Sequence, residues 1–293
     1  MKRTLISIAA IITFSIIMIS SGLIEQIWDG QKDRSNKGES EQIAHLEKNI
    51  STAAPIPASL SKEAIQEKML NSIHYFDSAK GSFRYTSEAA GFDVTVDYKV
   101  KLKKNEVAYQ IKETNHLQGE SSYEHVYEEG QIYDIFHDSN EFLKTDTFKI
   151  NDKGPIQKVK GSIKTVAGGQ KEYYYPATSI QLGAAGTSLH SKEIALGFLE
   201  NYQLWDVKGK EDFLGRKALL IEGTFSEYYQ KKLSAYSYQL IMDEATGIVF
   251  QLEIRSTDGK VLDSLTTTDI KINETVSIST ADVKKTYKEV KKN

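Results

Sequence analysis

Residues 92–102 read FDVTVDYKVKL, a stretch in which apolar and polar side chains alternate at every position. Successive side chains of a strand point to opposite faces of a sheet, so this period of two predicts a β-strand with one buried and one solvated face. Residues 104–105 predict a turn, and residues 107–111 continue the alternation beyond it. The stretch therefore predicts an antiparallel hairpin.

Further strands are expected on both sides of the chain's midpoint. Alternating apolar residues at 123–127 and a turn into 131–136 would complete a four-stranded antiparallel meander. A second meander is expected after Gly209, with strands at 217–222, 234–242, 248–254 and 261–273. The turn at 243–247 ends in a glycine where a positive φ is needed, which predicts that its two strands are antiparallel neighbours.

Two amphipathic helices are expected beside these strands. Ile65, Met69 and Ile73 recur every four residues, which predicts a helix from about residue 61 to residue 75. A second helix is expected over residues 191–202. The apolar side of each helix must be buried against another element, and the nearest one along the chain is a sheet. Strands and helices together therefore indicate the α+β class.

The first segment of the chain has a different composition. Lys2 and Arg3 precede an uncharged apolar run from Thr4 to Ile24, which is long enough to cross a membrane as a helix. The positive charges before the run predict that the remainder lies outside the cytoplasm. We expect residues 1–24 to be an uncleaved N-terminal transmembrane anchor in the cell membrane. The alternative is a cleaved signal segment, which would make the protein secreted.

Three more regions follow this segment. Residues 25–58 are expected to form a polar linker, because positions 29–41 contain no apolar side chain. A β-rich domain is expected at 59–281, and a lysine-rich tail, as a short exposed helix or a frayed end, at 282–293. Within the domain, residues 151–190 are less regular and are either a functional loop or an irregular insertion with one short helix.

Composition and motifs exclude several kinds of function. The 293 residues contain no cysteine, which excludes disulfides, thiolate catalysis and cysteine-based zinc sites. The net charge is −3, and without a strong positive field we expect no nucleic-acid partner. Nucleophile-elbow, zinc-protease, phosphate-loop and dinucleotide-binding motifs are absent from the sequence. We therefore expect neither an enzyme nor a bound cofactor.

Histidines and carboxylates near the predicted strands could in principle form a metal site or an acid–base pair. His116, His125 and His137 lie in or beside successive strands, but a metal centre needs three or four ligands at defined geometry, and we expect none. His125 is interpreted as a packed or surface residue of its strand. Asp134, Asp138 and Glu141 have no spacing that singles out an acid and a base, and we interpret them as residues of a solvated loop.

The order of helix, meander, loop, helix and meander resembles the LolA-like fold. The pattern is most similar to the large N-terminal domain of the RseB/MucB-type anti-sigma regulators. The residues that carry this likeness are FLGRKA at 213–218, the strand around Tyr238, the turn at 243–247, Asp258-Gly259 and Ile272-Asn273. The resemblance implies a curved, unclosed antiparallel sheet, a half-barrel, with helices packed in its concavity and an apolar cavity. The smaller C-terminal domain of those regulators has no counterpart in this sequence.

The resemblance implies a binding protein, for which two roles are possible. A third alternative is a hydrolase with an unfamiliar site. The first role is to hold a lipid or other hydrophobic ligand in the sheet's concavity, in cell-envelope homeostasis. The second is to regulate envelope stress signalling by binding a membrane anti-sigma factor or a similar membrane regulatory protein. The candidate ligand contacts are Tyr98, Tyr109, Phe198, Arg216 and Phe250. Arg216 is interpreted either as a cation paired with Glu211 or Asp212, or as a contact at the mouth of the cavity.

Overall fold

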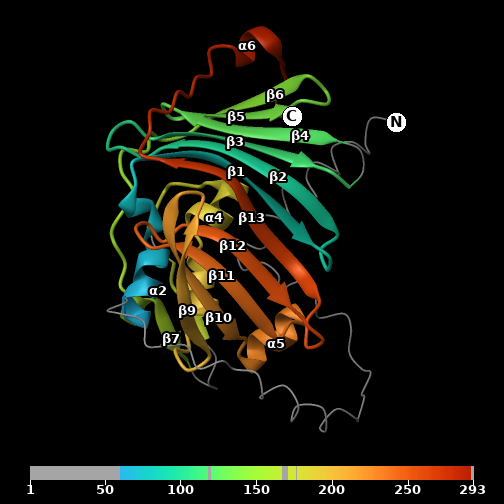
Figure 1. Ribbon diagram of the computed structural model, residues 1–293. Coiled ribbons are helices and arrows are strands. Elements are labelled where there is room, and N and C mark those ends of the chain that lie inside the picture. The colour runs from blue at the N-terminus through green and yellow to red at the C-terminus, as the bar shows by residue number, and fades with distance from the viewer. Residues whose placement is uncertain (1–59, 118–119, 167–170, 176, 292–293) are drawn as a thin grey trace. The chain divides into compact units, whose positions relative to one another are not determined.

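The chain from Leu60 onward is built around one large β-sheet (Figure 1). The computed structural model describes residues 60–117, 120–166, 171–175 and 177–291. The large sheet contains β1 (Ser78–Ser87), β2 (Phe92–Lys101), β3 (Ala108–Asn115), β4 (Ser121–Glu128), β5 (Gln131–Phe136), β6 (Glu141–Asp146), β9 (Trp205–Phe213), β10 (Arg216–Thr224), β11 (Ser237–Asp243), β12 (Val249–Arg255), β13 (Val261–Ile272) and β14 (Lys288–Glu289). A separate hairpin consists of β7 (Ile163–Thr165) and β8 (Lys171–Tyr173).

Strand order shows how the two meanders become one sheet. The order is β14-β6-β5-β4-β3-β2-β1-β13-β12-β11-β10-β9, and only β14 with β6 is a parallel pair among these described strands. β1 pairs with β13 and so joins the first meander to the second. β14 and β9 are the two edges and do not pair with each other. The unclosed antiparallel sheet and the α+β class predicted from the sequence are thereby confirmed.

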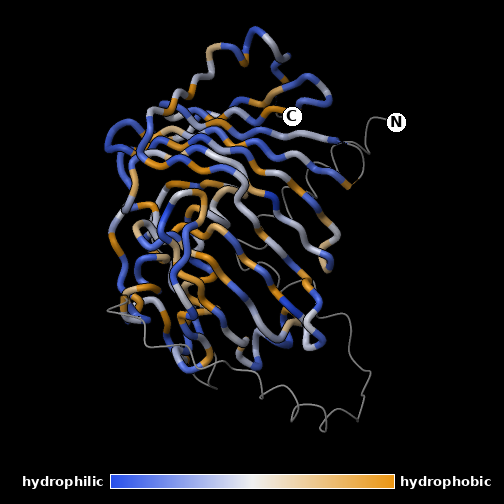
Figure 2. The backbone as a smooth tube through the Cα atoms, viewed as in Figure 1, coloured by the Kyte–Doolittle hydropathy of each residue, from blue (hydrophilic) through white to orange (hydrophobic). Residues whose placement is uncertain are grey.

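The helices are short and lie mostly between the two halves of the sheet. They are α2 (Lys62–Leu70), η4 (Ser72–Tyr75), α3 (Val159–Ser162), η6 (Gly183–Ala185), α4 (Gly186–Leu189), the π-helical turn η7 (Ile194–Phe198), α5 (Glu227–Leu233) and α6 (Val283–Thr286). The helix expected over 191–202 is thus a π-helical turn of five residues. Figure 2 shows apolar and polar residues alternating along the strands that surround these helices.

Contacts of η6 and α4 show that the sheet is curved. η6 contacts β2 and β3, whereas the adjoining α4 contacts β12. β3 and β12 are four positions apart in the strand order, or about 19 Å in a flat sheet at roughly 4.8 Å per strand. Residues 183–189 in helical conformation span only about 11 Å. These contacts agree with Figure 1, in which the sheet bends around the helices and leaves them on its concave side.

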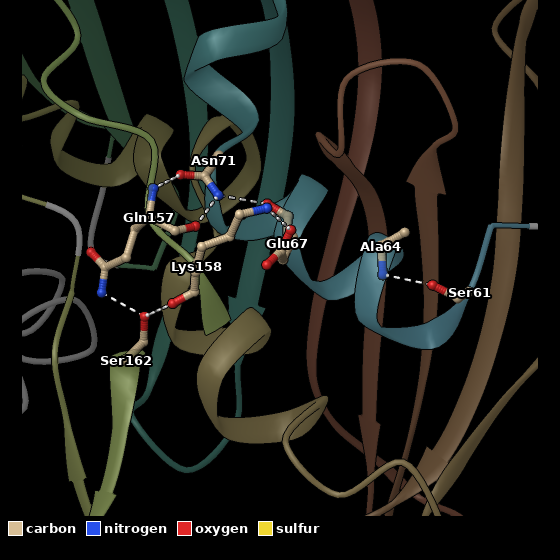
Figure 3. Close-up of polar contacts among 7 residues, drawn as sticks. All are labelled: Ser61, Ala64, Glu67, Asn71, Gln157, Lys158 and Ser162. Atoms are coloured by element: carbon tan, nitrogen blue, oxygen red, sulfur yellow. Dashed lines mark hydrogen bonds and ion pairs between the residues drawn. The ribbon is translucent and has the colours of Figure 1, made fainter. Parts of the chain in front are cut away.

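The end of α2 is tied to the chain that follows β6 (Figure 3). Asn71 donates through Nδ2 to the carbonyls of Glu67 and Gln157, both at 2.8 Å, and its Oδ1 accepts from the Gln157 amide at 2.8 Å. Lys158 pairs with Glu67 at 2.9 Å. Residues 151–190 accordingly hold several short elements, of which α3 and the β7–β8 hairpin begin directly after this attachment.

Six of the described strands were not predicted from the sequence: β1, β6, β7, β8, β9 and β14. β6 and β9 have few apolar residues, and β1 carries alanine and glycine where larger inward residues would reveal the alternation. The glycine has a steric reason. A Cβ at Gly81 would lie 2.2 Å from the Asp269 carbonyl oxygen and 2.8 Å from the Tyr98 hydroxyl. The inward position on β1 must therefore stay empty.

Residues 282–293 differ from the expected exposed helix or frayed tail. The helix, α6, is short, but Val283 is buried against Val126 and Phe142, and β14 adds to the sheet edge beside β6. The many lysines predicted an exposed segment, but Val283 and Tyr287 between them are apolar and pack on the sheet. No helix of the described residues is long and apolar enough to span a membrane. The anchor expected at 1–24 and the linker at 25–58 lie outside those residues.

Gly247 offers a test of how closely α2 approaches the β11–β12 turn. Its φ is +81°, and a Cβ there would lie 2.6 Å from the Lys68 carbonyl oxygen of α2. Gly259 has nearly the same φ, +82°, with open space around it. Gly259→Ala should cost about 1–2 kcal/mol of unfolding free energy from backbone strain alone. Gly247→Ala should cost a further 1–3 kcal/mol or so, because α2 must move. Urea unfolding followed by circular dichroism measures both, and equal losses would contradict this packing.

Candidate functional site

The buried face of the sheet changes between β3 and β4. On β2 and β3 the buried side chains include Val96, Tyr98 and Ile111, which lie on the concave side, next to the residues that η6 covers. Ile111 is directly opposite His125 on β4, so His125 continues the concave face. The next residue, Val126, points to the opposite side and is 1% exposed. On β4–β6 it is therefore the convex face that is fully packed.

The C-terminal segment explains this change. Val126, Tyr133, Ile135, Phe142 and Val283 form one apolar cluster on the convex side of β4–β6. Convex residues of β1–β3 have no such cover and are charged or polar, as the alternation at 92–102 predicted. Apart from Tyr127, which is 1% exposed and stacks on Tyr109, the concave side of β4–β6 is consequently left half-buried. It carries, from strand to strand, Tyr123, His125, Ile132, Asp134, Phe136 and Leu143.

Four polar side chains converge on this half-buried surface. His125 Nδ1 lies 2.7 Å from Asp134 Oδ1, and the Tyr123 hydroxyl donates to the same carboxylate oxygen. Cross-strand pairing explains the arrangement, because His125 is directly opposite Asp134 and Tyr123 is opposite Glu113. We call Glu113, Tyr123, His125 and Asp134 the concave polar cluster. Aromatic rings frame it: Tyr109 stacks on His125 at 5.8 Å, and Phe136 packs on Tyr123 at 5.7 Å.

The electrostatics of the cluster are dominated by partial burial. Burial raises the pKa of Glu113 to about 7, while His125 and the backbone of Ala184 in η6 act in the opposite direction. Burial, followed by the charge of Asp134, raises the pKa of Tyr123. Near neutral pH the cluster thus offers a carboxyl group that is close to half protonated, a phenol and a His–Asp pair. Such groups can donate and accept hydrogen bonds to the polar end of a ligand.

The five candidate contacts from the sequence fall in separate places. Tyr98 and Tyr109 are both 2% exposed on the concave face of β2 and β3. Phe198 packs on Phe225 at 4.7 Å near α5, in a second aromatic group. Phe250 is fully buried and stacks on Phe213. The structure brings Tyr109 to the concave polar cluster and leaves the others away from it.

Arg216 has a different partner from the two that the sequence analysis named. It pairs with Asp243 at 2.8 Å, and the Asp243 side chain is 1% exposed. Asp243 also accepts from the hydroxyl of Thr246 at 2.6 Å. The pairing of β10 with β11 places Ala218 opposite Asp243, so that Arg216, two residues earlier, reaches Asp243. This pairing joins residues far apart in the sequence and is not predictable from neighbours along the chain. Arg216 therefore holds the β11–β12 turn together.

His125 and Asp134 were seen in the sequence but not recognised as a pair. The alternation of apolar and polar residues places both on strands. Their contact depends on the register of β4 with β5, which the alternation does not give. The other two histidines lie elsewhere, because His116 contacts Thr95 and His137 contacts Glu124. Within the described ranges, no group of three or more histidine, aspartate or glutamate residues could hold a metal ion.

A charged groove lies on the opposite, convex face. It has a volume of about 340 Å³ and crosses β13, β1, β2, β3 and β4. Lys99, Lys112, Asp97 and Asp269 line it, and none of the four makes an ion pair with a described residue. Its mixed charge makes it unsuited to an acyl chain. An apolar ligand would therefore be expected on the concave side.

Fold and site together define the class of this protein. It is an α+β protein whose curved, unclosed antiparallel sheet presents a half-buried aromatic and polar surface on its concave side. No protein-family model matches the chain, and no curated protein sequence matches it. Solved structures similar to this chain were found, all at low sequence identity.

Among these structures is MucB of Pseudomonas aeruginosa in complex with MucA, with a TM-score of 0.40 and 12% identity over 76% of this chain. The chain spans 60% of that MucB chain. The lipoprotein LppX of Mycobacterium tuberculosis has a TM-score of 0.35 and 13% identity, over 74% of this chain and 98% of LppX.

A LolA superfamily protein of Nitrosomonas europaea has a TM-score of 0.23 and 10% identity, over 74% of this chain and 96% of its own. Both groups named by the sequence resemblance, the LolA superfamily and MucB, are thus among the structures similar to this chain. All TM-scores lie below 0.5, and the site is therefore described from this chain's own residues.

The raised pKa of Glu113 predicts a pH dependence of stability. In the unfolded chain this carboxyl would titrate near its ordinary pKa of 4.5, and in the folded chain near 7. The folded state thus binds more protons between these values, so ionisation of Glu113 lowers the unfolding free energy as pH rises from about 4.5 to 7. The effect is at most about 1.4 kcal/mol per pH unit. Glu113→Gln should remove it.

The measurement is urea unfolding of the native chain and of Glu113→Gln at pH 5, 6 and 7.5. Burial lowers the pKa of His190 to about 3, which acts in the opposite sense but equally in both proteins. Their difference in unfolding free energy therefore isolates Glu113. Glu120→Gln, at an exposed position before β4, is the matched control and should run parallel to the native chain. A difference that stays constant with pH would rule out a raised pKa at Glu113.

Proposed function

We propose that this chain is a binding protein that holds an acyl chain, or another hydrophobic ligand, on the concave side of β3–β6. The observation that carries the proposal is the exposure of apolar side chains there. Ile132, Phe136 and Leu143 are only half-buried, although the alternate residues on the same strands are fully packed. Half-buried apolar groups in a concave surface beside a few polar groups are typical of sites for amphipathic molecules.

The ligand would occupy only part of the concavity. Ala185 and Leu189 are fully buried where η6 and α4 cross between β2, β3 and β12. The chain's own residues thus fill the space that the family resemblance implied as an open cavity. Room for a ligand is consequently sought beyond η6, over β4, β5 and β6. A chain laid there would gain about 0.8 kcal/mol for each CH₂ group removed from water.

The concave polar cluster suits the polar end of such a ligand. It lies next to the segment that carries η6, with Glu113 and His125 on neighbouring strands. A hydroxyl, amide or phosphate group placed there would find both donors and acceptors. Binding of this kind needs no bond to be made or broken, so we propose a carrier or sensor role without catalysis.

We also propose that the protein acts outside the cytoplasm, in cell-envelope homeostasis, attached to the membrane by residues 1–24. Support comes from the charge pattern around the apolar run at 4–24. The expected linker at 25–58, whose positions 29–41 contain no apolar side chain, would let the domain move near the bilayer.

A second function, contact with a membrane regulatory protein, is favoured by the charged groove on the convex face. Lys99 and Lys112 lie beside Asp97 and Asp269 there without ion pairs to described residues. A partner protein that carries both positive and negative side chains could form ion pairs with these four residues. Crosslinking at Lys99 in cells would distinguish the two functions, because only the regulatory role requires a defined protein at this face.

Leu143→Asp tests the ligand proposal. It places a charge among the apolar contacts, and losing two CH₂ contacts at about 0.8 kcal/mol each should weaken binding of a fluorescent fatty acid roughly tenfold to fifteenfold. Thr114→Asp, half-buried on the convex face of β3, is the matched control and should leave binding unchanged. Lipid that co-purifies with each protein is identified by mass spectrometry. Equal binding by both variants and the native chain would place the ligand elsewhere or exclude it.

The location is tested by fractionation of cells that produce the native chain or Lys2→Glu/Arg3→Glu. The native protein should stay in the membrane fraction after high-salt washing, and protease added outside the cytoplasmic membrane should degrade its domain. Loss of the two positive charges should reduce correct insertion. Recovery of the native protein in the cytosol would contradict both the anchor and the proposed role.

A further inference from the structure

Three lysine–tyrosine contacts gather at the end of the domain formed by the β7–β8 hairpin and α5. Lys164 lies over the ring of Tyr174 at 4.6 Å, Lys192 over Tyr175 at 5.6 Å, and Lys232 over Tyr228 at 5.5 Å. The three tyrosines are 41%, 38% and 52% exposed. We call these six residues the Tyr–Lys patch.

The parts of the patch belong to one surface. Tyr173 of β8 hydrogen-bonds Tyr229 of α5. Tyr228 of α5 is close enough to Tyr175 to contribute, after burial and Glu193, to the raised pKa of Tyr175. Tyr229 packs on Phe198 at 5.6 Å and on Phe225 at 6.3 Å. The exposed tyrosines are therefore supported from below by a packed aromatic group.

α5 has an unusual position for a helix. It contains no buried residue along its seven positions, Glu227–Leu233. Tyr229 is half-buried against Phe198, whereas Tyr228, Lys231 and Lys232 are exposed. Much of α5 therefore gains little from packing, which supplies most of the stability of helices in proteins. The sequence EYYQKKL combines aromatic and cationic side chains, which is typical of helices that lie in a membrane interface.

The positive charge of the Tyr–Lys patch indicates an anionic partner. Lys164, Lys192, Lys231 and Lys232 form no ion pair with a described residue. Of the nearby acids, Glu200 pairs with Lys171 and Glu172 accepts from the Tyr174 hydroxyl. Burial raises the pKa of Glu193 to about 7. Glu227, at the start of α5, is exposed, and the four lysines outnumber it. Unpaired lysines beside tyrosine rings match an anionic lipid surface, where the rings rest among the headgroups and the ammonium groups meet phosphate.

The route of the chain points to the same end of the domain. α2 begins at Lys62, whose ammonium contacts the carbonyl of Tyr202 at 2.7 Å, and α2 packs against η7. η7 in turn touches α5, since Tyr229 contacts Phe198 and lies against Gly197. Lys62 also pairs with Asp206 of β9, so the described chain starts at the β9 end of the sheet, the end at which α5 lies. If residues 25–58 form the expected linker, 34 residues of coil would reach about 30–35 Å on average. An anchor at 1–24 would then keep the patch at high effective concentration near the bilayer.

We propose that the Tyr–Lys patch docks on the headgroup region of an anionic lipid bilayer and sets the orientation of the domain there. The proposal rests on the membrane attachment proposed above only for its tether. Docking in this orientation directs the β9 end of the sheet toward the membrane, since α5 connects β10 to β11. β4–β6, at the opposite end of the strand order, then face away from the bilayer.

The cysteine-free sequence makes a direct test possible. Glu227→Cys places a single thiol in α5, and Asp282→Cys places one beside α6, at the opposite end of the sheet (Figure 1). Both replace an exposed acidic residue. The full-length proteins, labelled with an environment-sensitive dye, are mixed with vesicles of phosphatidylcholine containing about 30% phosphatidylglycerol. Some of the lipids carry bromine near the headgroup as a quencher.

We expect quenching and a blue shift at position 227 and neither at position 282. In vesicles of phosphatidylcholine alone, or at high salt, the signal at 227 should fall because the lysines lose their partner or are screened. Lys192→Gln/Lys231→Gln/Lys232→Gln should lower the docked population about a hundredfold, at a factor of roughly five per lysine. Lys231 and Lys232 are exposed and Lys192 is half-buried, and none of them belongs to the packed aromatic group. Circular dichroism verifies the fold.

Two results would overturn the proposal. If the chain floats with the vesicles but position 227 is not quenched, docking by the patch is wrong while the anchor stands. If both positions are quenched equally, the domain has no preferred orientation. A chain that does not float at all would contradict both the patch and the proposed membrane attachment.

Discussion

The pairing of β1 with β13 is the contact on which the rest of the structure depends. It joins two meanders that are far apart along the chain into one curved sheet. Gly81 lies at this junction, where any Cβ would overlap the Asp269 carbonyl and the Tyr98 hydroxyl. The concave side is then filled by η6 and α4, whose contacts to β2, β3 and β12 exist only because the two meanders face each other. Without the pairing of β1 with β13, each meander would expose the apolar face that these helices cover.

The change of buried face between β3 and β4 creates the candidate site. The C-terminal segment covers the convex side of β4–β6 through Val283, so these strands can leave their concave side half-buried and remain packed. That side carries the concave polar cluster together with Phe136 and Leu143. A surface of this kind is costly to leave in water unless something occupies it at least part of the time. This is the physical reason for proposing a ligand there and not in the charged groove.

The proposed ligand surface and the Tyr–Lys patch lie at opposite ends of the strand order and rely on different chemistry. The first combines apolar side chains with a carboxyl group whose pKa is near neutrality. The second combines exposed rings with unpaired lysines. If both hold, the domain rests on the bilayer at one end and offers its ligand surface to molecules on the side away from it. A membrane-tethered sensor or carrier would benefit from such a fixed orientation.

The sequence by itself determined what depends on neighbours along the chain. The alternation at 92–102 located a two-faced strand, the four-residue repeat of Ile65 and Met69 located α2, and the turn at Gly247 located the β11–β12 hairpin. The unclosed antiparallel sheet followed from these elements with the family resemblance. Tertiary structure alone decided which face each strand buries, the partner of Arg216, and the meeting of His125 with Asp134. The reason is that register and long-range cover are set by contacts between residues far apart in the sequence, and a local period of two is the same whichever face is eventually covered.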